Sequence, residues 1–135
     1  MMRRQGSESL PVREEADLLL ARRLVRERAT ELGFGILDLT KIVTAASELG
    51  RNTLIHGGGG TMLLEILVEP DRRGVRLTFE DQGPGIADLA QAMTDGFTTR
   101  SGMGLGLGGS KRLVNEFELV SRVGHGTKVI VTRWT

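Results

Sequence analysis

The sequence predicts an α+β fold, a two-layer sandwich in which a mixed, mostly antiparallel sheet carries helices on one face. Two segments with helical periodicity come first, over residues 14–32 and 38–56. Hydrophobic side chains then alternate with a period of two over residues 62–68 and 75–79, and again toward the C-terminus. Runs of helix followed by runs of strands joined by hairpins are typical of this fold class.

The first helix follows a short N-terminal region. We expect residues 1–6 to form a flexible tail, residues 7–135 to form a single domain, and residues 9–12 to form a short edge strand. The helix itself is predicted over residues 14–32, and the glycines that follow it are typical of a helix C-terminus. The side chains that we expect it to turn toward the core are Leu20, Leu24 and Leu32.

The second helix is predicted to begin at Asp38, a favoured N-cap residue, and to run to His56. A run of glycines over residues 57–60 then ends it. Helical spacing turns four of its side chains toward the core, namely Ile42, Ala45, Ala46 and Leu49.

The strands follow in two hairpins. A turn at residues 71–74 joins the first two strands, and the second of these leads directly into Asp81. The closing hairpin is expected to pair residues 119–123 with residues 127–133. Between the hairpins we expect a short helix near residues 88–93, a polar irregular segment over 94–104 and a third helix over 105–117.

Composition limits the classes of function. With 135 residues, the chain is long enough for one domain with its own core. Its net charge of +1 is too balanced to indicate a nucleic-acid binder. Cysteine is absent, which excludes disulfides, thiol catalysis and cysteine-ligated metals. No apolar stretch is long enough for a membrane span and no signal peptide is visible, so we expect a cytoplasmic protein.

Three polar residues recur at helical spacing in the second helix, namely Glu48, Asn52 and His56. They share one face of the helix, and we expect this face to border the core beside Ala45 and Leu49. A carboxylate there can accept a proton or orient a nucleophile, and an amide oxygen suits Mg²⁺. A solvated helix face with a hydrogen-bonded pair explains the same pattern, and on this pattern alone it is favoured. His56 fits a helix C-terminal residue better than a metal ligand.

Asp81 directly follows a predicted strand and opens the segment Asp-Gln-Gly-Pro-Gly. A carboxylate at a strand end can accept a hydrogen bond from an amino group such as N6 of adenine. Gly83 and Gly85 would let the backbone of the turn lie against a flat ring. A plain glycine-proline turn with a solvated aspartate explains the segment equally well.

Glycine occurs 19 times and is concentrated near the expected third helix. Residues 102–106 open that helix, so its free N–H groups and positive dipole end form a candidate phosphate site. The glycines over residues 96–104 suit a lid. The apolar Phe97 within it either pins this segment to the core or contacts a partner, and the polar neighbours favour the partner. The match to G-x-G-x-x-G over residues 104–109 is weak, because no strand precedes it. A poorly formed helix start is the alternative.

In this order the motifs resemble the GHKL ATP-binding family, which includes gyrase-type ATPases and sensor histidine kinases. The matching segments are residues 48–56, 81–86, 102–106 and 124–127. The resemblance implies the Bergerat nucleotide-binding fold rather than a P-loop or Rossmann site.

Further segments look like the RsbT type of stressosome serine kinase, namely residues 80–86, 95–99, 111–117 and 133–134. Residues 100–104 are equally similar to the anti-sigma-factor kinases of the same superfamily. The resemblance therefore implies a kinase of one of these two branches.

The resemblance also implies a role for each matching position. Asp81 would bind adenine N6 with support from Thr127, and Asn52 would hold Mg²⁺. Glu48 would orient and deprotonate a serine hydroxyl of a partner protein, and Arg100 would approach the γ-phosphate of ATP. The remaining nucleotide-binding positions are Gly83, Gly85, Ile86, Gly102, Met103, Gly104, Leu105 and Gly106.

The implied substrate is a serine or threonine on a STAS-domain antagonist protein (RsbS-like), with its scaffold homologue as a second partner. The released kinase would then activate a PP2C-type phosphatase. One alternative is an anti-sigma factor kinase that sequesters a sigma factor and phosphorylates an anti-anti-sigma factor. Another is a non-catalytic, nucleotide-responsive binding module, from which Glu48 distinguishes a kinase because pure binding needs no base. We expect neither a nucleic-acid nor a membrane partner.

Overall fold

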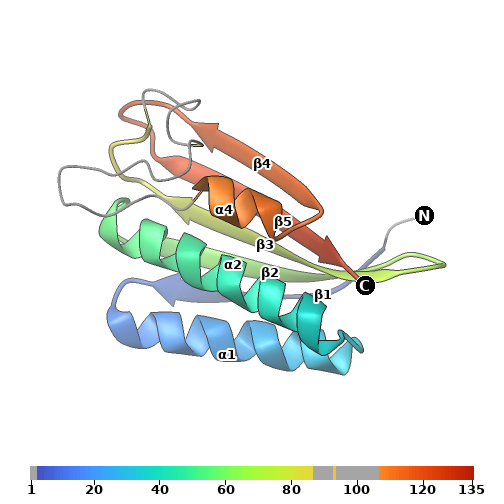
Figure 1. Ribbon diagram of the computed structural model, residues 1–135. Coiled ribbons are helices and arrows are strands. Elements are labelled where there is room, and N and C mark those ends of the chain that lie inside the picture. Colours follow the sequence, from blue (N-terminus) through green and yellow to red (C-terminus); the bar gives the residue numbers. More distant parts are fainter. Residues whose placement is uncertain (1–2, 87–92, 94–106) are drawn as a thin grey trace.

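Five strands form one antiparallel sheet, and the helices cover one face of it (Figure 1). The structure is a computed structural model that describes residues 3–86, 93 and 107–135. The predicted α+β class is confirmed, and every strand pair of the described residues is antiparallel in place of the mixed sheet that the sequence predicts. The strands run in the order β1-β2-β3-β5-β4. Their bounds are β1 (Arg3–Val12), β2 (Gly60–Val68), β3 (Arg73–Asp81), β4 (Glu116–Ser121) and β5 (Thr127–Trp134).

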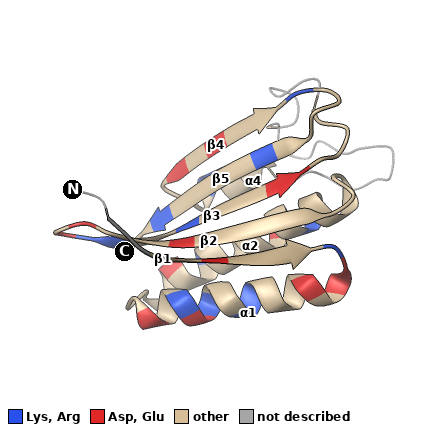
Figure 2. Cartoon of the chain, turned by 180° about the vertical axis from the view of Figure 1, so that it is seen from behind, with Lys and Arg blue, Asp and Glu red and all other residues tan. Residues whose placement is uncertain are grey.

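The described helices all lie on the same side of this sheet. They are α1 (Glu15–Glu31), α2 (Ile36–Ile55) and α4 (Leu107–Arg112). The two long helices run side by side along the sheet, and the short α4 packs against α2 (Figure 1). Seen from behind, the other face of the sheet is covered by no helix of the described residues (Figure 2). The core therefore lies between α1, α2 and one sheet face.

The predicted core residues are buried in α2, but not all of those predicted in α1 are. All four expected core residues of α2 are buried, namely Ile42, Ala45, Ala46 and Leu49. The prediction is wrong at Leu20, which is 51% exposed, whereas Leu24 and Leu32 are partly buried against the core. Leucine occupies three consecutive positions here, so helical periodicity alone fits more than one buried face. Packing on the sheet selects the face with Leu18, Ala21, Val25 and Ala29.

α2 begins earlier than the sequence predicts. Its N-cap is Gly35, so Asp38 lies inside the first turn and the N-cap prediction is wrong. The Asp38 carboxylate accepts hydrogen bonds from Arg133 of β5, at 3.1 Å from Nε and 2.5 Å from Nη2. An acidic side chain in a first turn is favourable for the helix dipole, and here it also ties α2 to the sheet.

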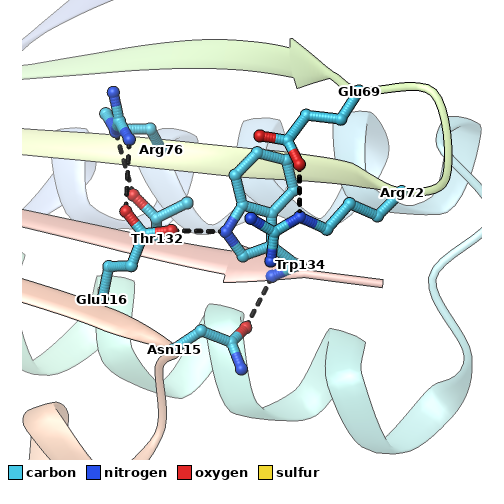
Figure 3. Close-up of polar contacts among 7 residues, drawn as sticks. All are labelled: Glu69, Arg72, Arg76, Asn115, Glu116, Thr132 and Trp134. Atoms are coloured by element: carbon cyan, nitrogen blue, oxygen red, sulfur yellow. Dashed lines mark hydrogen bonds and ion pairs between the residues drawn. The ribbon is translucent and has the colours of Figure 1, made fainter. Parts of the chain in front are cut away.

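α4 is shorter than the helix predicted over residues 105–117, because the chain enters β4 at Glu116. The side chain of Asn115 accepts the backbone N–H of Trp134 at 2.7 Å, and Glu116 Oε2 accepts the indole N–H at 2.5 Å (Figure 3). The guanidinium of Arg72 lies over the indole ring, 3.9 Å from its centroid. These contacts are long-range in sequence and override local helical periodicity.

β1 begins at Arg3 and pairs with β2 along its whole length. It is an edge strand, as predicted, but it is longer than residues 9–12 and includes residues 3–6 of the expected tail. The expected helix near residues 88–93 and the segment over 94–104 lie outside the described residues, apart from residue 93. No described helix is long and apolar enough to cross a membrane.

Candidate functional site

A pocket opens where the C-terminal half of α2 faces the ends of β3 and β5. It contains about 460 Å³ of empty space, its open mouth included. Five of the sequence-predicted site residues line it, namely Asn52, Asp81, Gly85, Ile86 and Thr127. The other described residues around it are Leu49, Thr53, His56, Gly57, Phe79, Leu107 and Val129.

Asp81 is the buried carboxylate of this pocket. It is the last residue of β3, and it is 8% exposed. Its Oδ1 accepts the backbone N–H of Gly83 at 2.8 Å, and a backbone hydrogen bond from Thr127 also stabilises the carboxylate. Burial raises the pKa of Asp81 above its ordinary value, because desolvation of the charge outweighs these two hydrogen bonds. A carboxylate has about four acceptor positions, so it can accept a further donor from a ligand.

Glycines let the backbone close tightly around Asp81. A Cβ atom on Gly57 would overlap the Asp81 carboxylate, and a Cβ on Gly83 would lie 2.7 Å from the Gly57 carbonyl oxygen. Gly126 has a φ of +82°, and a Cβ there would overlap the Asp81 carbonyl oxygen. The position of the carboxylate therefore depends on the absence of side chains at these turns.

Three polar side chains stand in a row at this end of the sheet. Asp81 is paired with Thr127 across β3 and β5, and Thr127 is paired with Ser121 across β5 and β4. Residues paired in this way lie on the same face of a sheet. Ser121 Oγ lies 2.8 Å from Thr127 Oγ1 and 2.8 Å from the backbone nitrogen of Ile86. Ser121 is missing from the sequence prediction, because its place follows from strand register and not from any motif spacing.

α2 places its three polar residues at different depths. Asn52 and His56 are partly buried and line the pocket, whereas Glu48 is exposed. The expectation that the whole stripe borders the core is therefore wrong at Glu48, because this turn of α2 directs Leu49 rather than Glu48 toward the pocket. Glu48 lines a separate groove between α1 and α2, which also includes Leu19 and Arg22. Burial lowers the pKa of His56.

The predicted phosphate-side residues lie outside the described part of the chain, namely Arg100, Gly102, Met103, Gly104, Leu105 and Gly106, together with Phe97. The description resumes at Leu107, which begins α4 and lines the pocket.

The pocket combines apolar walls with hydrogen-bonding groups at one end. Its walls include the apolar side chains of Leu49, Phe79 and Ile86, while the polar groups at the strand ends come from Asp81 and Thr127. Among the described residues, no group of three or more His, Asp or Glu side chains could hold a metal ion. An amide oxygen such as that of Asn52 can serve Mg²⁺ as one ligand among waters and phosphates.

Residues 37–134 match the family described as histidine kinase-, DNA gyrase B- and HSP90-like ATPases. The chain is 45% identical over 120 residues to the serine/threonine-protein kinase RsbT of Bacillus subtilis, covering 89% of this chain and 90% of RsbT. It is 35% identical over 104 residues to the anti-sigma F factor of Bacillus cytotoxicus, covering 72% of this chain and 70% of that protein.

The fold is also found in a solved structure. The crystal structure of the RsbU and RsbW domains of Rv1364c from Mycobacterium tuberculosis matches 96% of this chain with a TM-score of 0.65 and 22% identity. This chain spans about a third, 32%, of that longer protein chain. The chain belongs to the histidine kinase-, DNA gyrase B- and HSP90-like ATPase family and, like RsbT, is an ATP-dependent protein serine/threonine kinase.

Proposed function

We propose that this kinase works in a partner-switching module, where it uses Mg²⁺ and ATP to phosphorylate a serine or threonine on a STAS-domain antagonist protein. Once released from that antagonist or its scaffold homologue, it would bind and activate a PP2C-type phosphatase in the cytoplasm. The similarity to RsbT and to an anti-sigma F factor supports this class of function.

The observation that carries the nucleotide site is the buried carboxylate of Asp81 at the end of an apolar pocket. A buried charge is unfavourable unless hydrogen bonds compensate it, and two backbone N–H groups do so only in part, since the pKa of Asp81 is still raised. The amino group of adenine would supply a further donor. Asp81 and Thr127 would therefore bind the edge of the base, while Gly83, Gly85 and Ile86 form the loop beside it.

On the phosphate side of the proposed site, we assign different roles to Asn52 and Glu48. Asn52 lines the pocket, and its amide oxygen is of the ligand type that Mg²⁺ accepts, so we assign the metal to Asn52. The metal would supply neutralisation of the phosphate charge. Glu48 lies one helical turn away and is exposed, so a hydroxyl of another protein can reach it from outside. We assign to Glu48 the orientation and deprotonation of that hydroxyl.

The remaining roles lie in the part of the chain outside the described residues. Arg100 would approach the γ-phosphate, and backbone N–H groups of residues 102–106 would bind phosphate oxygens, as the family resemblance implies. Their proposed place is consistent with Leu107, the next residue, lining the same pocket.

A phosphotransfer assay with labelled ATP and purified STAS-domain proteins tests this proposal. Glu48→Gln should retain Mg²⁺-ATP binding but lose transfer by about 10²- to 10⁴-fold, the usual range for a positioned general base. Asn52→Ala should remove the magnesium dependence of nucleotide binding. The matched control is Glu15→Gln, which removes a carboxylate from the same groove as Glu48 and should leave transfer unchanged.

Two results would contradict the proposal. If the unmodified kinase labels no STAS-domain protein, the substrate class is wrong. If Glu48→Gln transfers phosphate at the normal rate, Glu48 is not the base.

An anti-sigma factor kinase is the second candidate, and the anti-sigma F factor relative favours it. This candidate predicts a stable complex with a sigma factor, which size-exclusion chromatography with purified sigma factors would detect. A chain that binds ATP and partners but transfers no phosphate would instead be a nucleotide-responsive binding module.

A further inference from the structure

We propose that Ser121 determines the base specificity of this pocket by fixing the Thr127 hydroxyl as a hydrogen-bond acceptor. The inference rests on the proposed nucleotide site around Asp81. It assigns to Ser121, which contacts the site through Thr127 and Ile86, a positioning role rather than a catalytic one.

The Ser121 hydroxyl has three neighbours at hydrogen-bond distance. The backbone N–H of Ile86 donates to Oγ at 2.8 Å. The carbonyl oxygen of Gly126 lies 3.0 Å from Oγ, and the hydroxyl of Thr127 lies 2.8 Å away. A serine hydroxyl has one proton to donate and two lone pairs that accept. All three contacts can therefore be hydrogen bonds only if its proton and both lone pairs are used.

Only one arrangement of protons satisfies all three contacts. A carbonyl oxygen cannot donate, so the Ser121 proton must point to Gly126. Ile86 occupies one lone pair of Oγ, and Thr127 must then donate its own proton to the other. The opposite arrangement, in which Ser121 donates to Thr127, would leave two acceptor oxygens 3.0 Å apart at Gly126.

This arrangement decides what Thr127 offers to the pocket. Thr127 donates its only hydroxyl proton to Ser121. Toward a ligand, the Thr127 hydroxyl oxygen can therefore only accept a hydrogen bond. Asp81 next to it is also an acceptor. The edge of the pocket thus presents acceptors from two adjacent strands. It favours a base that carries an amino group and disfavours one that carries a carbonyl at the same position, because two acceptors would then face each other.

Calorimetric titration of the full chain with ATP and with inosine triphosphate, each with Mg²⁺, tests the inference. The two nucleotides differ at the same edge of the base: adenine carries a 6-amino group beside an N1 acceptor, whereas hypoxanthine carries a 6-carbonyl beside an N1–H donor. The unmodified protein should prefer ATP. In Ser121→Ala the Thr127 hydroxyl can rotate and donate, so the preference should fall by about 3- to 10-fold, the range that one neutral hydrogen bond controls.

The variants separate positioning from a structural effect. Ser121→Thr retains the hydroxyl and should retain the preference, and Ser47→Ala is the matched control, because its hydroxyl bonds the Val43 carbonyl within α2. Thr127→Val should lower the preference, and adding Ser121→Ala to it should have no further effect. If Ser121→Ala fails to fold, Ser121→Cys retains most of the volume with a weak donor and should show the same loss.

Other results would contradict the inference or the proposed site. Equal weakening of both nucleotides in Ser121→Ala would mean a structural role and overturn the inference. An unchanged preference for ATP in Ser121→Ala would overturn the inference and leave the proposed site in place. Equal binding of the two nucleotides by the unmodified protein would overturn the inference and also count against the contact between Asp81 and the amino group. Binding of neither nucleotide to the unmodified protein would remove the proposed site itself.

Discussion

Gly57→Ala displaces the proposed adenine-binding carboxylate without changing the chemistry of Asp81. The backbone at Gly57 has no positive φ, so alanine can adopt its conformation. The added methyl group would overlap the Asp81 carboxylate, and either the carboxylate or the turn after α2 must move. Rotation of the carboxylate would break its 2.8 Å hydrogen bond with the Gly83 N–H.

The expected magnitude follows from the bond that the ligand loses. A hydrogen bond to a charged group contributes about 1.5–3 kcal/mol, so losing the one between Asp81 and adenine should weaken ATP binding by about 10- to 150-fold. Overpacking by the added methyl group destabilises the fold by about 1–3 kcal/mol. Replacing a glycine stabilises the fold by about 0.4–1 kcal/mol, because it lowers the conformational entropy of the unfolded chain. The free energy of unfolding should therefore fall by about 0–2.5 kcal/mol, and the domain should remain folded.

Calorimetric titration with ATP and urea unfolding measure the two effects separately. Gly109→Ala is the matched control, since no atom lies within 4 Å of the Cβ position there and Gly109 is in a helix. It should leave ATP affinity unchanged and stabilise the fold by up to about 1 kcal/mol. Unchanged ATP affinity in Gly57→Ala, with the fold intact and a crystal structure showing the Asp81 carboxylate displaced, would refute the assignment of the base site to that carboxylate.

Three further predictions concern the fold. Asp38→Ala removes the ion pair with Arg133, whose side chain is 15% exposed, and should lower the free energy of unfolding by about 1–3 kcal/mol in urea; an unchanged midpoint would contradict the link. Trp134→Phe keeps an aromatic ring but loses the bond to Glu116, so the same assay should show a loss of about 1–2 kcal/mol, and no loss would argue against that bond. Burial lowers the pKa of His56, so the unfolded chain binds this proton more readily. Stability should then decrease as the pH falls below 6.5, and His56→Gln should reduce that slope; an identical slope would contradict the burial of His56.

Local sequence patterns predict the fold correctly where the hydrophobic periodicity fits only one buried face. In α2 a single apolar stripe fits the helical period, and its four predicted core residues are buried. In α1 the run Leu18–Leu20 fits more than one face, and only packing against the sheet selects Leu18. The helix predicted over residues 105–117 fails at its C-terminal end for a similar reason, because the chain leaves the helix after Arg112 and enters β4 at Glu116, where Asn115 and Glu116 bond the distant Trp134.

The residues of the candidate site also differ in whether a local sequence pattern can identify them. Asn52, Asp81 and Thr127 belong to linear motifs, and the structure arranges them around one pocket, while their roles remain predictions. Ser121 could not be identified in this way, because its contact with Thr127 depends on the register of two strands. Glu48 was expected near the core and is exposed, since helical spacing fixes which residues share a face but not how that face is oriented on the sheet.

The most direct test of the central claim is the affinity of Asp81→Asn for ATP, measured by calorimetric titration beside the unmodified protein. The amide keeps the size of the side chain and can still accept the Gly83 N–H, but it loses the charge and one acceptor oxygen. We predict that ATP binds about 10- to 150-fold more weakly, while circular dichroism shows an unchanged fold. Equal ATP affinity in the two proteins would contradict the claim that this pocket binds adenine through Asp81.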